Sequence, residues 1–137
     1  MGYHKPLPEP DGDRKPFWEG CREHRLRFQQ CEACGHVRWP PAIICPQCHS
    51  RQTVWIESSG RGRVYTYTVY HQAFQQAFKD DLPYVVAVVA LTEGPHLLTN
   101  IVGCSHEAVT CDMPVTVAWE DVTDAVSLPK FRPLDAP

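Results

Sequence analysis

The chain has 137 residues, an apolar fraction of 43% and a formal net charge of −3. That length is enough for one compact domain, or for a small metal-stabilised module followed by a small barrel. The negative net charge argues against a protein that binds phosphate backbones. No apolar run reaches the roughly 18 residues of a membrane span, and no secretory signal is present, so a cytoplasmic protein is expected.

The N-terminal part of the chain predicts an extended tail followed by a short helix. Residues 1–12 contain three prolines among polar residues and predict the tail. Asp13 is expected to cap a helix over residues 13–25. Phe17 and Cys21 are four residues apart and therefore share one face of this helix.

Two CxxC pairs follow an alternating segment, residues 26–30, which predicts a strand. Cys31 and Cys34 form the first pair, Cys45 and Cys48 form the second, and ten residues separate the pairs. This spacing is a strong signal for one Zn²⁺ held by four thiolates. A closed site of this kind has no open coordination position, so the sequence predicts one structural zinc ion and no zinc catalysis.

Other interpretations of these cysteines stay open at this point. Iron could occupy the same ligand set. Two disulfides would need an oxidising compartment, and a redox motif would need one CxxC pair beside a βαβ pattern. Gly35 suits a tight turn around a metal, and residues 35–44 are long enough for a short hairpin. Cys21, Cys104 and Cys111 are expected to be free thiols that act as small apolar residues.

The chain after Cys48 is rich in β-branched and aromatic residues. Residues 53–57 predict a last ribbon strand, and the glycine-rich segment 58–62 predicts a turn and a module boundary. The apolar run 84–91 is too short for a membrane span and predicts a buried central strand. Barrel strands are predicted at residues 63–70, 84–91, 96–102, 115–119 and 125–131.

The predicted fold is mainly β, with an N-terminal helix, a rubredoxin-like zinc ribbon and a five-stranded OB-fold barrel. The predicted boundaries are a tail over residues 1–12, the helix and ribbon over 13–58, and the OB-fold domain over 59–137. Within the loop between the first two barrel strands, residues 72–78 could form a helical turn.

Short motifs follow one another in a fixed order along residues 13–132. They are Phe17-Trp18-Glu19, Cys31-Glu32-Ala33-Cys34-Gly35, Trp39-Pro40-Pro41, Cys45-Pro46-Gln47-Cys48, Ser59-Gly60-Arg61-Gly62-Arg63-Val64-Tyr65-Thr66, Thr68-Val69-Tyr70-His71, Pro83-Tyr84, Leu91-Thr92-Glu93-Gly94 and Met113-Pro114-Val115. On these motifs the chain resembles the zinc-ribbon and OB-fold proteins associated with acyl-CoA enzymes, known as domain of unknown function thirty-five. Cys111 and Asp112 stand where the family usually has a glycine, which affects one turn.

The resemblance implies that the chain is a small, standalone partner of a thiolase-superfamily enzyme. Members accompany acyl-CoA thiolases, hydroxymethylglutaryl-CoA synthase assemblies and steroid side-chain aldolases, and some accompany acyl-CoA hydratases. They bridge or complete an acyl-CoA site and carry no catalytic triad of their own. The expected complex is a heterotetramer around the enzyme's dimer, because such enzymes are usually two-fold symmetric. A second function stays open, a module that binds single-stranded nucleic acid, although the negative net charge argues against it.

Six residues are candidate contacts with a partner or with acyl-CoA. Arg61 and Arg63 could meet CoA phosphates, because a guanidinium group binds phosphate through two N–H groups, or they could lie on a solvated edge strand. Phe74 and Phe78 would share the face of a helical turn. The complete set is Trp39, Arg61, Arg63, His71, Phe74 and Phe78.

Each remaining aromatic candidate has two interpretations. Trp39 is either an exposed binding anchor or packs on the N-terminal helix. His71, at the expected barrel mouth, is either a general base or a hydrogen-bonding residue that contacts a partner. Tyr65 and Tyr67 are expected to share one face of their strand, in the core or toward a partner.

Overall fold

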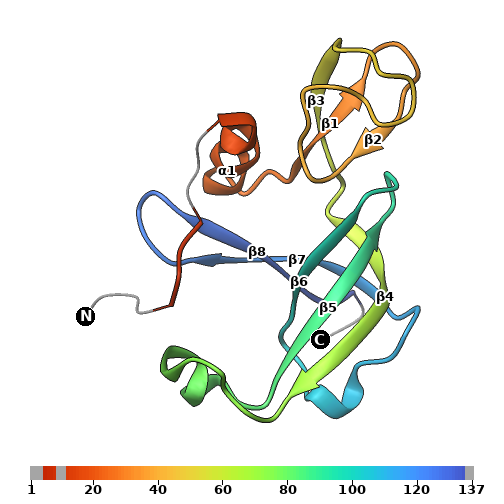
Figure 1. Cartoon of the computed structure of the whole chain (residues 1–137). Helices are drawn as coiled ribbons and strands as arrows, with labels where there is room; N and C mark the ends of the chain where they lie inside the picture. The colour runs from red at the N-terminus through yellow and green to blue at the C-terminus, as the bar shows by residue number, and fades with distance from the viewer. Residues whose placement is uncertain (1–4, 9–11, 135–137) are drawn as a thin grey trace.

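The chain forms a short helix, a small ribbon sheet and a closed barrel, in that order along the sequence (Figure 1). The computed structural model describes residues 5–8 and 12–134, so residues 1–4 and 9–11 of the predicted tail lie outside the described part. None of the helices in the described ranges is long and apolar enough to cross a membrane. The mainly β fold agrees with the sequence prediction.

The N-terminal helix begins later and ends earlier than predicted. A 3-10 turn, η1 (Gly12–Arg14), leads into α1 (Lys15–Arg22). Arg14 occupies the N-cap position and makes no side-chain capping bond, so the predicted Asp13 cap is wrong, because the 3-10 turn absorbs that residue. His24 has a φ of 59°, and this left-handed residue closes the helix. Phe17 and Cys21 are both buried, as their spacing predicts.

Three strands form the ribbon sheet, in the order β2-β1-β3. Strand β1 (Arg27–Cys31) pairs antiparallel with both β2 (Val37–Arg38) and β3 (Thr53–Glu57). The hairpin predicted over residues 35–44 forms only in part, because Pro40 and Pro41 have no N–H group with which to continue the ladder. The chain between β2 and the second CxxC pair is therefore a loop.

Five strands close the barrel in the order β4-β5-β6-β8-β7, as the OB-fold prediction requires. All pairs are antiparallel except β6 with β8. Strand β4 pairs with β5 and with β7, so Arg61 and Arg63 do not lie on an edge strand. The bounds are β4 (Arg61–Tyr70), β5 (Tyr84–Leu91), β6 (His96–Ile101), β7 (Pro114–Asp121) and β8 (Ser127–Pro133).

A β-bulge in β4 separates two tyrosines that the sequence places together. The register between β4 and β5 shifts between Val64 and Thr66, which leaves Tyr65 as the extra residue. Tyr65 is 62% exposed, whereas Tyr67 packs against the barrel core. The prediction that the two rings share one face of the strand is therefore wrong.

The loop after β4 holds a short 3-10 helix, η2 (Gln76–Asp81), in place of the predicted turn over 72–78. Because η2 begins after Phe74, this residue and Phe78 do not share a helical face. A third 3-10 turn, η3 (His106–Ala108), precedes β7, and the Ser105 hydroxyl accepts a hydrogen bond from the Glu107 N–H.

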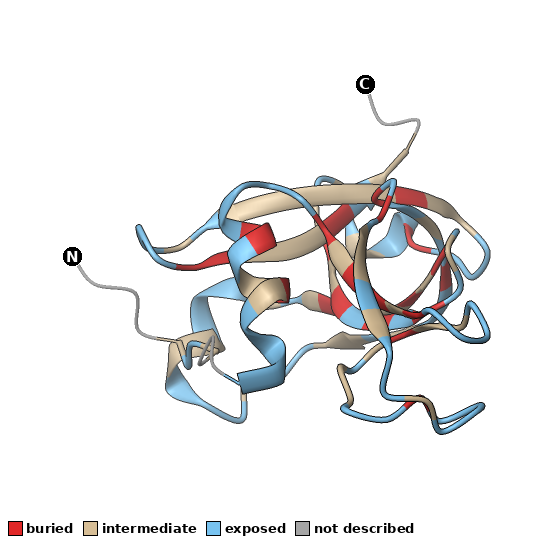
Figure 2. Ribbon diagram, turned by 90° about the horizontal axis from the view of Figure 1, so that it is seen from above, coloured by how far each residue is buried: buried red, intermediate tan, exposed pale blue. Residues whose placement is uncertain are grey.

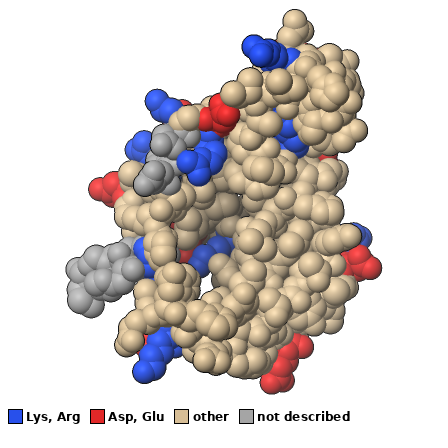
Figure 3. Space-filling view, in the orientation of Figure 1, with Lys and Arg blue, Asp and Glu red and all other residues tan. Residues whose placement is uncertain are grey.

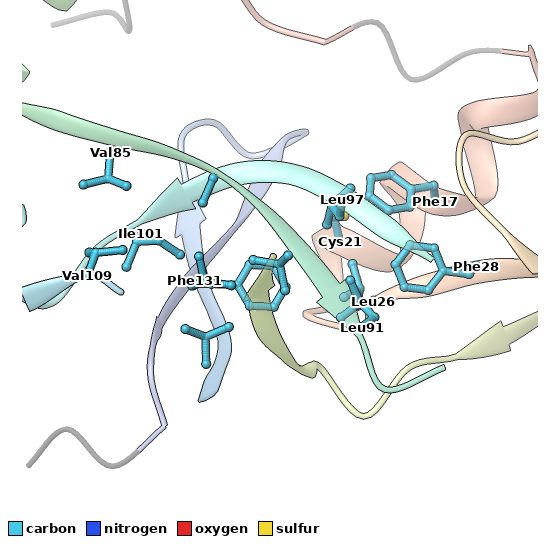
Figure 4. Packing of buried hydrophobic residues seen from close by; sticks show 14 residues of the cluster. Phe17, Cys21, Leu26, Phe28, Val85, Leu91, Leu97, Ile101, Val109 and Phe131 are labelled. Carbon is cyan, nitrogen blue, oxygen red and sulfur yellow. The ribbon is translucent and has the colours of Figure 1, made fainter. Parts of the chain in front are cut away.

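One apolar cluster runs from the barrel to the helix. Figure 4 shows Phe131 and Ile101 inside the barrel, and Phe17 and Phe28 beyond its end, joined through Leu97 and its neighbours. In the view from above, buried residues recur along the barrel strands, whereas the loops are mostly exposed (Figure 2). The helix therefore packs on the barrel and does not stand apart from it.

Two glycines explain the Ser59–Thr66 motif in physical terms. Gly60 has a φ of 78°, and a Cβ at this position would lie 2.7 Å from a methyl carbon of Val117. A Cβ at Gly62 would lie 2.5 Å from the Ala90 carbonyl oxygen. Glycine at both positions lets β4 approach β5 and β7 closely enough to close the barrel.

A carboxylate fixes the junction between the ribbon and the barrel. The Ser58 hydroxyl and the Ser59 N–H donate to the two oxygens of Glu93 over 2.6 and 2.9 Å. Burial acts to raise the pKa of Glu93, but these hydrogen bonds outweigh burial and lower it below its ordinary 4.5. The carboxylate therefore stabilises the junction above that pH, and this contribution is lost as the pH falls through the lowered pKa.

Candidate metal centre and contact residues

The two CxxC segments adopt the same backbone turn. The Gly35 N–H donates to the Cys31 carbonyl, and the His49 N–H donates to the Cys45 carbonyl, both over 2.9 Å. Gly35 and His49 have φ angles of 82° and 64°, so each turn ends with a left-handed residue. Gly35, which the sequence predicts for a tight turn at the first pair, has His49 as its counterpart at the second.

The four sulfur atoms of these turns gather at one point. The Sγ atoms of Cys31, Cys34, Cys45 and Cys48 all lie within 4.8 Å of one another. Those of Cys31 and Cys48 are 3.5 Å apart, and those of Cys34 and Cys45 are 3.7 Å apart. Tetrahedral zinc with Zn–S bonds of about 2.3 Å separates its sulfurs by about 3.8 Å, whereas a disulfide needs about 2.05 Å. The four thiols fit zinc, and the disulfide interpretation is wrong.

At Cys31 and Cys45, backbone N–H groups favour the thiolate form that a metal requires. At Cys48 a backbone hydrogen bond from Ser50 acts to lower the pKa, but the Cys31 sulfur and burial outweigh it and raise the pKa to about 12. A hydrogen bond from the backbone of Cys34 lowers the pKa of Cys31 to about 6. Burial acts to raise the pKa of Cys45, but backbone hydrogen bonds from Cys48 and Gln47 outweigh it and lower that pKa. Away from this centre, burial raises the pKa of Cys21 to about 12, so Cys21 stays a thiol inside the core.

A buried arginine beside the metal centre was not predicted. Arg38 is 4% exposed, and its Nη2 donates to the Ala42 carbonyl over 2.9 Å and to the Thr53 hydroxyl over 2.7 Å. The Gln29 side chain accepts the Ala42 N–H over 2.8 Å. These side chains hold the loop that the prolines exclude from the sheet. The sequence signal was the Pro-Pro pair, since a loop without ladder bonds needs side-chain partners.

Trp39 packs on the N-terminal helix, which is the second of the two roles that the sequence left open for it. Its ring centroid lies 4.1 Å from that of Phe17. The indole also lines an apolar groove of about 520 Å³ between the ribbon loop and the turn that joins β5 and β6. A partner-contact role for Trp39 stays a prediction.

The six candidate contact residues do not form one compact site. Arg61 and Arg63 lie at the start of β4, and the Arg63 guanidinium donates to the Asp112 carbonyl over 2.8 Å. His71 follows the other end of this strand, about 30 Å away at about 3.3 Å per residue. There its ring lies 5.5 Å from the ring of His106.

The two phenylalanines of the loop are joined through two tyrosines. The ring of Phe74 contacts Tyr70 at 6.2 Å, Tyr70 stacks on Tyr84 at 5.1 Å, and Tyr84 contacts Phe78 at 5.8 Å. Phe74 is 82% exposed, whereas Phe78 lines a cavity of about 440 Å³ beside β5 and β6. Figure 3 shows the surface hollowed near the middle of the molecule.

Two family models match consecutive parts of the chain. Residues 18–54 match "ChsH2, rubredoxin-like zinc ribbon domain", and residues 55–120 match "ChsH2, C-terminal OB-fold domain". The first segment contains all four clustered cysteines, which supports zinc as the metal.

Curated and solved relatives agree with these matches. A "Probable enoyl-CoA hydratase alpha subunit" of Thermomonospora curvata is 40% identical over 94% of this chain, which spans only 40% of that protein. A "DUF35 domain-containing scaffold protein" of Methanocaldococcus jannaschii is 39% identical over 77% of this chain and 79% of its own length. The solved structure "Ltp2-ChsH2(DUF35) aldolase" superposes with a TM-score of 0.84 at 39% identity, over 93% of this chain and 98% of the matched one.

Proposed function

We propose that this chain, which belongs to the ChsH2 (DUF35) family of zinc-ribbon and OB-fold proteins, is an accessory subunit of a thiolase-superfamily enzyme. The enzyme is of the thiolase or aldolase type. The observation that carries this proposal is the likeness to the DUF35 chain of an Ltp2-ChsH2 aldolase over 98% of that chain. The name of the hydratase relative refers to a CoA thioester, which supports an acyl-CoA site shared between the two subunits.

The chain alone is expected to show no turnover with acyl-CoA substrates. His24 and Ser127 both bond the carboxylate of Asp121, so the imidazole does not bridge the hydroxyl and the carboxylate as it does in a catalytic triad. Purified chain should give no thiolysis, hydration or retro-aldol cleavage in a CoA-release assay. Activity of the chain alone that a point substitution abolishes would contradict this expectation.

The proposed complex is a heterotetramer with one copy of this chain on each protomer of a dimeric enzyme, because a two-fold enzyme offers two equivalent docking surfaces. Co-expression with a thiolase-superfamily protein of the same organism should give co-elution at micromolar concentration in size-exclusion chromatography. Separate elution of the two folded, zinc-loaded proteins would contradict the proposal. A salt-dependent shift of single-stranded DNA or RNA would instead favour the nucleic-acid module.

A further inference from the structure

Strand β5 of the barrel is apolar on both of its faces. Val85, Ala87, Val89 and Leu91 of β5 point into the barrel and are at most 4% exposed. The alternate positions face outward, yet they are also apolar, and Val86 and Val88 are only partly covered. A strand that borders water on one face normally alternates apolar and polar residues, and an apolar run suits a strand covered on both faces.

Neighbouring strands add apolar side chains on both sides of β5, and the uncharged Thr66, Thr68 and Asn100 lie between them. Leu98 of β6 lies opposite Val88 and is 69% exposed. On β4 the bulge turns Tyr65 outward, and its ring contacts that of His96 at 4.7 Å. Toward the other end of β4, the exposed Phe74 continues the surface through Tyr70. We define the outer apolar face as Tyr65, Tyr70, Phe74, Val86, Val88 and Leu98.

This face carries no charge. No Lys, Arg, Asp or Glu occurs from Val64 to Phe78, in β5 or in β6, although the chain has 13 basic and 16 acidic residues. Figure 3 shows the same side of the molecule, where the surface over β5 is without charged atoms and the coloured ones lie around it. A surface of this kind complements an uncharged, apolar protein surface, and it has no cations for phosphate groups.

The backbone at this face is already paired. Strand β5 bonds to β4 on one side and to β6 on the other along its length, so it offers no free edge to an added strand. The occupant must therefore dock through side chains. Tyr65, Leu98 and Phe74 are the most exposed large side chains of the face and suit the role of anchors.

We propose that the outer apolar face is the surface on which the enzyme subunit docks, through an uncharged apolar patch of its own. This inference rests on the function proposed above and replaces the scattered contact candidates with one uncharged surface. Of the six predicted contacts, Phe74 belongs to it, and the other five, Trp39, Arg61, Arg63, His71 and Phe78, do not.

The test compares two matched substitutions that place a carboxylate on an exposed strand position. Leu98→Asp lies in the face, and Val54→Asp, at a residue 41% exposed on β3, lies in the ribbon. We expect Leu98→Asp to weaken binding of the co-expressed enzyme subunit at least about thirtyfold in calorimetry, while Val54→Asp changes it less than about threefold. Both variants should keep zinc and melting temperature, since surface substitutions rarely change stability by more than about 0.5 kcal/mol.

Hydroxyl-radical footprinting of the unmodified complex gives an independent readout. Tyr65, Phe74 and Leu98 should be protected from oxidation, and Val54 should not. Unchanged affinity of Leu98→Asp together with unprotected Tyr65 and Leu98 overturns the docking face and leaves the accessory role standing. Absence of any complex with the unmodified chain overturns the accessory role itself. A homodimer that Leu98→Asp converts to a monomer would show that a second copy of this chain covers the face.

Discussion

Replacing Cys45 by serine is expected to abolish metal binding and to unfold the ribbon. The Cys45 sulfur is fully buried and lies among the other three, so a hydroxyl at this position leaves one corner of the tetrahedron without a thiolate. Structural zinc contributes apparent free energies of about 10–16 kcal/mol in small zinc modules, which is as large as the whole stability of a typical domain. The native chain should contain about one zinc per molecule by elemental analysis, and the variant close to none.

Cys111→Ser is the matched control for this substitution. Cys111 is exposed and stands outside the sulfur cluster, so its replacement should leave metal content and melting temperature unchanged. The unfolded ribbon of Cys45→Ser should be visible as lost near-ultraviolet circular dichroism and as lower solubility. A chain that stays fully folded after a chelator has removed its metal would contradict the structural role, and iron in place of zinc would correct the identity of the metal.

The parts of the fold that the sequence predicted are those with a strong local signal. The CxxC spacing located the metal centre, and β-branched or alternating runs located the barrel strands at residues 63–70, 84–91 and 115–119, because both patterns act over a few neighbouring residues. The same runs could not reveal the bulge at Tyr65, since a register shift depends on how β4 meets β5. The assumption of strict alternation therefore placed Tyr65 and Tyr67 on one face.

Other features depend on contacts between residues far apart in the sequence. Arg38 and Glu93 look like surface residues, yet one is buried under the ribbon loop and the other joins the barrel to Ser58 and Ser59. The outer face of β5 was missed for the opposite reason. Its continuous apolar run was read as a strand buried on both faces, whereas the outward side is only partly covered.

The replacement of Phe17 by alanine is expected to be the most costly change outside the metal centre. Phe17 is 1% exposed and contacts Trp18, Phe28 and Trp39 at centroid distances of 5.0, 6.3 and 4.1 Å. Loss of a buried phenylalanine side chain typically costs about 3–5 kcal/mol, while alanine itself is favourable in a helix. The melting temperature should fall by about 10–20 °C.

Phe74→Ala removes the same side chain from a position that is 82% exposed, so its effect on unfolding free energy should stay within about 0.5 kcal/mol. The two variants should separate stability from docking, because Phe74→Ala is expected to weaken the complex and Phe17→Ala to weaken the fold. Phe17 joins α1, the ribbon loop and β1, so its loss should also loosen the ribbon on the barrel and lower zinc retention under chelator competition. Similar melting temperatures for the two variants would contradict the view that this ring joins the helix, the ribbon and the barrel into one core.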